Sequence, residues 1–376
     1  QPKGPAQPIP QQAKPSVPMP MTEEIYLKPQ IEFRHVLSEL SVNRNDPCEV
    51  LRELISNSYD AGAKHIEYVP LKDQKGLAFL DDGSGLDSST EIKGITPWAA
   101  FFSIGKSTKN KGDGIGYKCQ GSKLCFACSR ILVATTTGVP VGEWKYKVID
   151  NPRSNLDVSL DITPQLTNDL PSLLSGFFAT PSADTASGIA HLKSKITSLS
   201  GPGTLILIDH LDTEDFGKYF AIGPKPEESY VFNYVRFYTR HGDVRWITAE
   251  QGFTAAQRSQ VTPGIAGASL SCFAGKKITT TPFGYPYLDI GKIDPSIKTP
   301  AQVSRLRDGR FYARTAKSFS VDTEKFSIIL AIDGNRRAHD EYTSLGRRGK
   351  GQARSGLRLS DHRGVFISVK GIKICK

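Results

Sequence analysis

Residues 46–62 (DPCEVLRELISNSYDAG) form the segment that most constrains what this chain can fold into. Asp46 can cap a helix, Pro47 suits the first helical position, and Glu49 stands where a capping-box carboxylate belongs. Gly62 is typical of the residue that follows a helix end. The segment therefore predicts one helix with defined ends.

One face of this predicted helix is polar. At 100° per residue, Glu53, Asn57 and Asp60 fall within about 60° of each other. The other side carries four residues that we expect to face a core: Leu51, Leu54, Ile55 and Ser58. Taken alone, the polar face is more simply explained as a solvated stripe than as a binding site.

A predicted strand follows at residues 75–80 (KGLAFL) and ends in the sequence DDGSG, residues 81–85. An aspartate at a strand end, followed by Gly-x-Gly, places a carboxylate at the mouth of a sheet beside a backbone that a ligand can approach closely. Farther along, Gly203 and Thr204 open a second apolar strand, LILIDHL.

Glycines and lysines cluster between residues 105 and 123. A P-loop is excluded, although GKST at residues 105–108 ends like one, because Ala100 stands where the first glycine is required. Glycines that open an apolar helical stretch, with lysines nearby, predict a cradle for phosphate groups. The glycines are Gly112, Gly114, Gly116 and Gly121, and the lysines are Lys106, Lys109, Lys111, Lys118 and Lys123.

Four motifs thus occur in order across residues 53–204: ELISNSYDAGA, DDGSG, GIGYKCQGSK and GT before a strand. Their order and spacing resemble those of the GHKL ATPases, the superfamily of gyrase, Hsp90-type chaperones, histidine kinases and MutL, and most closely its MORC-like members. The resemblance implies an α+β fold, with a Bergerat-type α/β sandwich at residues 31–240. It also implies a small α/β transducer-like (ribosomal-protein-like) domain at residues 241–376, while the Pro-rich residues 1–30 are expected to be a disordered arm.

The resemblance implies a role for each matching position, with ATP and Mg²⁺ as cofactors. Glu53 matches the general base that polarises the attacking water, and Asn57 matches the Mg²⁺ ligand. Asp81 matches the acceptor of a hydrogen bond from the adenine amino group, supported by Thr204. The other cofactor-binding positions are Gly83, Gly85, Lys106, Gly114, Gly116, Gly121 and Lys123. The chain departs from the family at Cys119, where a further glycine is frequent, and residues 86–113 would form a lid over ATP.

The excess positive charge lies at the C-terminal end. The chain has 48 Lys+Arg and 38 Asp+Glu, a net charge of +10, and residues 301–376 alone contain 17 basic and 7 acidic side chains. Arginine suits phosphate contacts, so DNA or RNA binding is one interpretation, and pairing with an acidic protein surface is the other. The arginines and one lysine are Arg305, Arg307, Arg310, Arg314, Arg336, Arg337, Arg347, Arg348, Lys350, Arg354, Arg358 and Arg363. Lys350 is also the candidate for the transducer lysine that reaches the γ-phosphate in the related ATPases.

The resulting hypothesis is a Mg-dependent ATPase that dimerises through its ATPase heads and acts as a clamp, similar in role to MORC or MutL. Two alternatives stay open: an Hsp90-like chaperone, and a nucleotide-gated binding module without hydrolysis. A sensor histidine kinase is disfavoured, because the segment before Glu53 leaves no room for a dimerising helical hairpin.

The six cysteines look like free thiols in a reducing compartment, either cytoplasm or nucleus. Cys125 and Cys128 have the spacing of a metal or redox pair, but no second pair completes a zinc site, so a buried structural role is favoured. The sequence has neither an apolar run long enough for a membrane span nor an N-terminal secretory signal.

Overall fold

The structure is a computed structural model, and its chain divides into two units, Gln1–Glu32 and Phe33–Lys376. All the residues that it describes belong to the second unit. They are residues 46–103, 108, 121–155, 160–222, 229–249, 253–261, 267–284, 313–332, 347–348, 352–353, 364–369 and 372–375. The Pro-rich arm predicted at residues 1–30 therefore lies outside the described residues.

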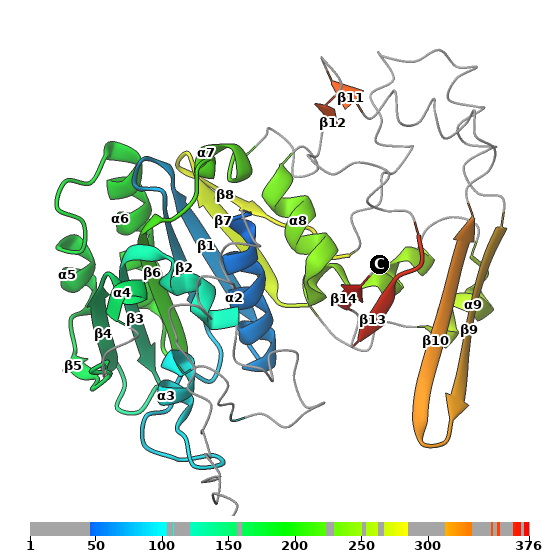
Figure 1. The fold of residues 1–376 in the computed structure, drawn as a ribbon, viewed down its shortest axis with the longest axis horizontal. Helices are drawn as coiled ribbons and strands as arrows, with labels where there is room; N and C mark the ends of the chain where they lie inside the picture. Colours follow the sequence, from blue (N-terminus) through cyan, green and yellow to red (C-terminus); the bar gives the residue numbers. More distant parts are fainter. Residues whose placement is uncertain are drawn as a thin grey trace, which may run out of the picture. The chain divides into compact units, whose positions relative to one another are not determined.

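An eight-stranded sheet with the order β5-β4-β3-β6-β2-β1-β7-β8 forms the centre of the fold (Figure 1). Every neighbouring pair is antiparallel except β1 and β7, which are parallel. The strands are β1 (His65–Leu71), β2 (Gly76–Asp81), β3 (Cys128–Thr136), β4 (Trp144–Asp150), β5 (Gln165–Thr167), β6 (Gly203–Leu211), β7 (Ser269–Ala274) and β8 (Lys277–Thr280).

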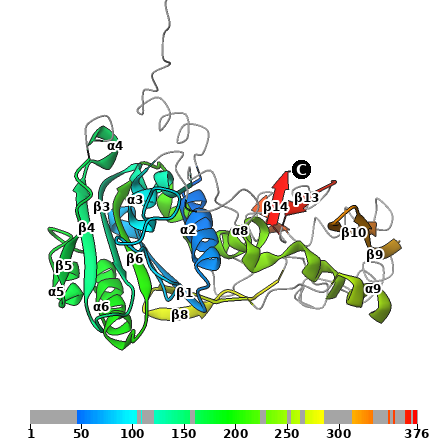
Figure 2. The ribbon, with the colours of Figure 1, turned by 90° about the horizontal axis from the view of Figure 1, so that it is seen from below.

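Helices cover both faces of this sheet, with α5 and α6 on one side and α2 on the other (Figures 1 and 2). The helices are α2 (Cys48–Asp60), α3 (Pro97–Phe102), α4 (Pro152–Asn155), α5 (Leu170–Ser175), α6 (Ala183–Ser198), α7 (Phe216–Tyr219), α8 (Tyr230–Tyr238) and α9 (Ala255–Gln260). The 3₁₀ turns are η1 (Lys72–Gln74), η2 (Gly121–Phe126), η4 (Arg240–Gly242) and η5 (Val244–Ala249). Among these described helices, none is long and apolar enough to cross a bilayer.

The middle of each central strand is apolar because both faces of the sheet are buried there. Along β2, Leu77 and Phe79 pack with α2, α3 and α8, whereas Ala78 and Leu80 pack with α5 and α6. The runs GLAFL and LILI therefore lack the polar alternation of a half-exposed strand.

Helix α2 matches the predicted helix, but its first turn is built differently. The side chain of Asp46 accepts a hydrogen bond from the backbone N–H of Cys48 at 2.9 Å, as a cap does. Glu49 forms no capping box; its carboxylate contacts Arg52 and Tyr234 instead. Gly62 follows the helix with φ +73°, as predicted for the residue after a helix end.

The sheet continues beyond residue 240, where we expected the first domain to end. Strand β7 pairs with β1 from His65↔Ser269 to Tyr68↔Cys272, and β8 pairs with β7. Leu270 and Cys272 belong to the same buried cluster as α2. Residues 269–280 thus complete the eight-stranded sheet rather than starting a separate one, and the division at residue 240 stays a prediction.

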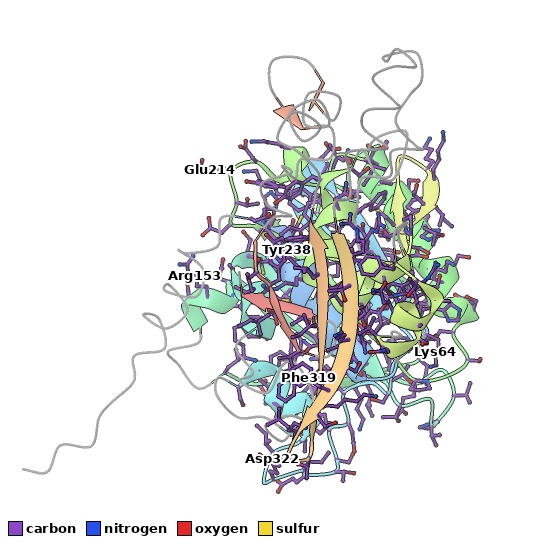
Figure 3. All side chains as sticks on the ribbon, turned by 90° about the vertical axis from the view of Figure 1, so that its right-hand side faces the viewer. Lys64, Arg153, Glu214, Tyr238, Phe319 and Asp322 are labelled. Atoms are coloured by element: carbon purple, nitrogen blue, oxygen red, sulfur yellow. The ribbon has the colours of Figure 1, made fainter. Side chains whose placement is uncertain are left out.

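Three short hairpins follow: β9 (Ala313–Val321) with β10 (Glu324–Ile332), β11 (Arg347–Arg348) with β12 (Gln352–Ala353), and β13 (Ile367–Val369) with β14 (Ile372–Cys375). Strand β10 contains the run FSIILAI, and β13 and β14 contain ISV and IKIC. In the longest hairpin, Phe319 stacks on Phe326 across the strands, and Asp322 lies at the turn (Figure 3).

Candidate functional site

Asp81 is a buried carboxylate at the end of β2, with only 6% of its surface exposed. The hydroxyl of Ser58 on α2 donates to one of its oxygens at 2.7 Å, and the backbone N–H of Gly83 donates to the other at 2.9 Å. Burial raises the pKa of Asp81 from 3.8 to about 6, although both hydrogen bonds act to lower this pKa. Each oxygen keeps acceptor capacity for one more donor.

Three polar side chains form a row across adjacent strands at this end of the sheet. Thr204 on β6 is the register partner of both Asp81 on β2 and Thr135 on β3. Each of the three lies two positions along its strand from a residue that packs against α2, so their side chains lie on the α2 face. The Thr135 hydroxyl accepts from Leu86 N–H at 2.7 Å and donates to Gly203 O at 3.1 Å. Within the described part of the chain, the Thr204 hydroxyl forms no hydrogen bond.

Sequence reasoning missed two members of this site, Ser58 and Thr135. We placed Ser58 in the core, and it is buried, but its hydroxyl also bonds Asp81. The sequence did contain a signal for Ser58: it stands among leucines and isoleucines on the buried side of the helix, and a buried hydroxyl needs a hydrogen-bond partner. Thr135 stood in the run Thr135–Thr137 at a strand end, where a side-chain acceptor can hold the loop beside it.

The turn after β2 is shaped by close packing and by backbone conformation. A Cβ at Gly83 would lie 2.8 Å from the Ala61 side chain and 3.0 Å from an Asp81 oxygen, so only glycine fits without displacing its neighbours. Gly85 has φ +75°, and a Cβ there would lie 2.5 Å from the carbonyl oxygen of Thr136. Both glycines therefore let the turn approach α2 and β3 closely.

The three polar residues on one face of α2 have different surroundings: two lie at the candidate site, and the third pairs with an arginine of η4. The Glu53 side chain is 19% exposed, and its carboxylate accepts from the Arg52 guanidinium at 2.6 Å. Asn57, one turn later, is half-buried, and no hydrogen bond of its side chain occurs among the described residues. Asp60, in contrast, is buried and paired with Arg240 at 3.4 Å, so it serves packing.

Lys123 lies in η2, which packs against α2 and α3, and only 2% of its surface is exposed. Its ammonium donates to the carbonyls of Ala100, at 3.3 Å, and Phe101 at the C-terminal end of α3. It also lies 5.7 and 5.8 Å from the ring centroids of Phe101 and Phe126. These contacts are internal to the protein, and a phosphate contact of Lys123 stays a prediction.

The first part of the expected lid is packed. Residues 97–102 form α3, whose Trp98, Phe101 and Phe102 belong to the core beneath α2. Residues 104–107 and 109–113 of the expected lid lie outside the described residues, so the lid stays a prediction.

Several predicted positions fall outside the described residues: Lys106, Gly114, Gly116 and Lys350, together with most of the C-terminal arginines. Gly121 opens η2, so it stands directly before the buried Lys123 turn. In the described part of the chain, no group of three or more His, Cys, Asp or Glu side chains could hold a metal ion. Cys125 is buried and burial raises its pKa to about 12, as expected of a structural thiol.

An α+β sandwich with a buried aspartate at a strand end, facing a helix that presents a glutamate and an asparagine, is the arrangement that the four motifs predicted. Residues 46–172 match the family described as "Histidine kinase-, DNA gyrase B-, and HSP90-like ATPase". This match confirms, for this part of the chain, the predicted GHKL superfamily and the α+β fold class. The closer resemblance to MORC-like members stays a prediction.

Solved structures of topoisomerase II share similarity with this chain. The ATPase and transducer domains of DNA topoisomerase II from Balamuthia mandrillaris match at 16% identity and a TM-score of 0.27, over 48% of this chain and 39% of theirs. The ATPase region of Saccharomyces cerevisiae topoisomerase II matches at 15% identity and a TM-score of 0.28, over 44% and 36%. The chain thus spans less than half of the length of these proteins. No curated protein sequence matches it.

Proposed function

We propose that this chain binds ATP with Mg²⁺ at the α2–β2–β6 site and hydrolyses it slowly. The observation that carries the proposal is Asp81: a carboxylate buried at a strand end, kept charged at some energetic cost and held in place by Ser58 and Gly83. A costly buried acceptor beside a glycine turn suits a ligand amino group better than it suits the fold.

In this proposal Asp81 accepts a hydrogen bond from the adenine amino group, and the Thr204 hydroxyl supports the same contact directly or through water. The Gly83–Gly85 turn lies close to the base because neither residue has a side chain. Specificity for adenine follows, since an acceptor-only carboxylate disfavours a purine that presents a carbonyl at that position.

Asn57 would hold Mg²⁺ through its amide oxygen, with phosphate oxygens and water completing the shell. The residues fit the ion: Asn57 offers an oxygen ligand with no competing partner among the described residues, and Mg²⁺ usually takes few protein ligands. When bound, the ion supplies charge neutralisation of the phosphates. Glu53, one turn earlier on α2, orients a water and accepts its proton as it attacks the γ-phosphate.

We further propose that ATP binding brings two chains together through their ATPase heads, forming a clamp that reopens after hydrolysis. The net charge of residues 301–376 supports nucleic acid as its target, because neutralising phosphates with arginine and lysine favours polyanions. The clamp would then hold DNA or RNA by its backbone.

Three variants test the ATPase proposal. Glu53→Gln should keep ATP affinity within about twofold and lower turnover by about a hundredfold or more, because only the base is lost. Asp81→Asn should abolish ATP binding, while Glu214→Gln, which removes an exposed carboxylate outside the site, should change neither. Binding with no turnover in the parent chain would favour the nucleotide-gated module, and full turnover in Glu53→Gln would refute the assignment.

The clamp is tested by size-exclusion chromatography with a non-hydrolysable ATP analogue, with and without duplex DNA. We expect an ATP-dependent shift to dimer, and DNA binding that weakens steeply between about 50 and 200 mM salt. A chain that stays monomeric, or DNA binding that ignores salt, would refute the corresponding part.

A further inference from the structure

Helix α8 is fastened to the first turn of α2 by tyrosine hydroxyls that the proposed reaction does not use. Tyr230 donates to the carboxylate of Asp46, and Tyr234 donates to that of Glu49. The two tyrosine rings lie 5.8 Å apart, one helical turn from each other. Figure 2 shows α2 between the sheet and α8.

Glu49 shares a partner with the proposed general base. One terminal nitrogen of Arg52 lies 2.9 Å from a Glu49 oxygen and 2.6 Å from a Glu53 oxygen. This nitrogen donates a hydrogen bond to Glu53 and forms an ion pair with Glu49. Both carboxylates therefore draw on the same nitrogen, and a change at one alters the hold on the other.

We propose that Tyr234 is a positioning residue for Glu53, acting through Glu49 and Arg52. The Tyr234 hydroxyl donates to one oxygen of Glu49, which weakens the attraction of Glu49 for the Arg52 guanidinium. The guanidinium then stays between Glu49 and Glu53 and holds Glu53 in a fixed orientation. Without that hydroxyl, Glu49 draws Arg52 toward itself, and the hydrogen bond from Arg52 to Glu53 weakens. The inference rests on the proposed function, because it requires Glu53 to be the base.

The contacts of Arg52 with Glu49 and Glu53 are strong because all three side chains are partly buried. The side chains of Arg52, Glu49 and Glu53 are 24%, 17% and 19% exposed, so charge-assisted hydrogen bonds between them are only partly weakened by water. Small displacements of the base matter, since a catalytic group misplaced by about 1 Å can cost about a hundredfold in rate.

Tyr230 provides the matched control. It lies on the same helix, its ring is adjacent, and its hydroxyl also donates to a carboxylate near the start of α2. Asp46, however, bonds Cys48 and Tyr230, and the ion pairs of Arg52 within the described residues are with Glu49 and Glu53. A merely structural role for these hydroxyls predicts equal effects of Tyr230→Phe and Tyr234→Phe, whereas positioning predicts an effect on turnover only at Tyr234.

Turnover and affinity are measured with the full 376-residue chain. Tyr234→Phe should lower kcat about three- to tenfold, with the Kd for a non-hydrolysable ATP analogue within twofold of the parent. Tyr230→Phe should leave kcat and Kd within twofold. Equal kcat values for the two variants, or a Kd change at Tyr234→Phe as large as its kcat change, would overturn the proposal.

A double-mutant cycle tests the route. If Tyr234 acts through Glu49, then Tyr234→Phe combined with Glu49→Gln should have the kcat of Glu49→Gln alone. In urea unfolding without nucleotide, the same pair should be coupled, whereas Tyr230→Phe with Glu49→Gln should be additive. Multiplicative kcat effects or an uncoupled Tyr234–Glu49 pair would refute the route.

Glu53→Gln separates the two levels of inference. If it abolishes turnover and Tyr234→Phe leaves kcat unchanged, the positioning role fails and the proposed function stands. If Glu53→Gln leaves turnover intact, both fail.

Discussion

Replacing Asp81 with asparagine should stabilise the nucleotide-free chain at neutral pH while it removes ATP binding. Burial raises the pKa of Asp81 to about 6, so the fold binds the proton more tightly than the unfolded chain, whose ordinary value is 3.8. The charged form is therefore disfavoured by the fold. At 1.36 kcal/mol per pH unit, the charged carboxylate costs about 3 kcal/mol above pH 6.

Asparagine can satisfy the same contacts. Its carbonyl accepts from Gly83 N–H, and its amide donates to the Ser58 oxygen, whose own hydrogen goes to the Leu54 carbonyl at 3.0 Å. The substitution thus removes a charge without stranding a buried donor or acceptor. We expect a gain of about 1 to 3 kcal/mol in the free energy of unfolding at pH 7.5.

The assay is urea unfolding of the parent and of Asp81→Asn, followed by the fluorescence of the buried Trp98 and Trp144 between pH 4 and pH 7.5. Because the parent loses stability as Asp81 ionises between pH 3.8 and 6, the difference between the two proteins should widen across that interval and then level off. Titration of other groups cancels in the difference. A difference that is independent of pH, or a less stable variant at pH 7.5, would refute the reasoning.

Three other outcomes follow from the structure. Burial lowers the pKa of His241 to about 4, so its contribution to stability is complete above pH 6.5 and should fall by about 3 kcal/mol toward pH 4; His241→Gln should flatten this dependence in the unfolding assay. Gly85→Ala should lower the free energy of unfolding by about 2 kcal/mol and weaken ATP binding, because its Cβ meets the Thr136 carbonyl at a φ of +75°, and an unchanged urea midpoint would contradict this. A fragment ending at residue 240 should be insoluble on expression, whereas one ending at residue 284 should stay soluble, because only the longer fragment keeps β7 on the edge of β1.

The parts of the site that sequence could predict are those written in local patterns. Helix α2 has its Asp46 cap and its Gly62 ending within one segment, and β2 and β6 are apolar runs bounded by glycine. Such patterns also fix which residues share a face, so Glu53 and Asn57 could be placed together without any knowledge of the sheet.

The parts that sequence could not predict depend on pairing between distant segments. Nothing near Ser269 says that β7 joins β1 in parallel, because register partners far apart in the chain leave no local trace. The burial of Lys123 depends on carbonyls of α3, more than twenty residues earlier, and the capping box fails at Glu49 because Tyr234 takes its carboxylate. A prediction from local sequence therefore fails where a residue far away in the chain forms the hydrogen bond instead.

His241, in the η4 turn that follows α8, holds the C-terminal end of that helix in place. The Tyr59 hydroxyl bonds His241 Nδ1 at 2.9 Å, and His241 Nε2 bonds the Thr281 carbonyl at 2.9 Å. The imidazole of His241 therefore links η4 both to α2 and to the segment after β8. Tyr230 and Tyr234 bond the first turn of α2, so α8 is held to α2 near both of its ends. We therefore expect the two helices to move as one body, so that a displacement at the start of α2 reaches the segment after β8 through α8 and His241.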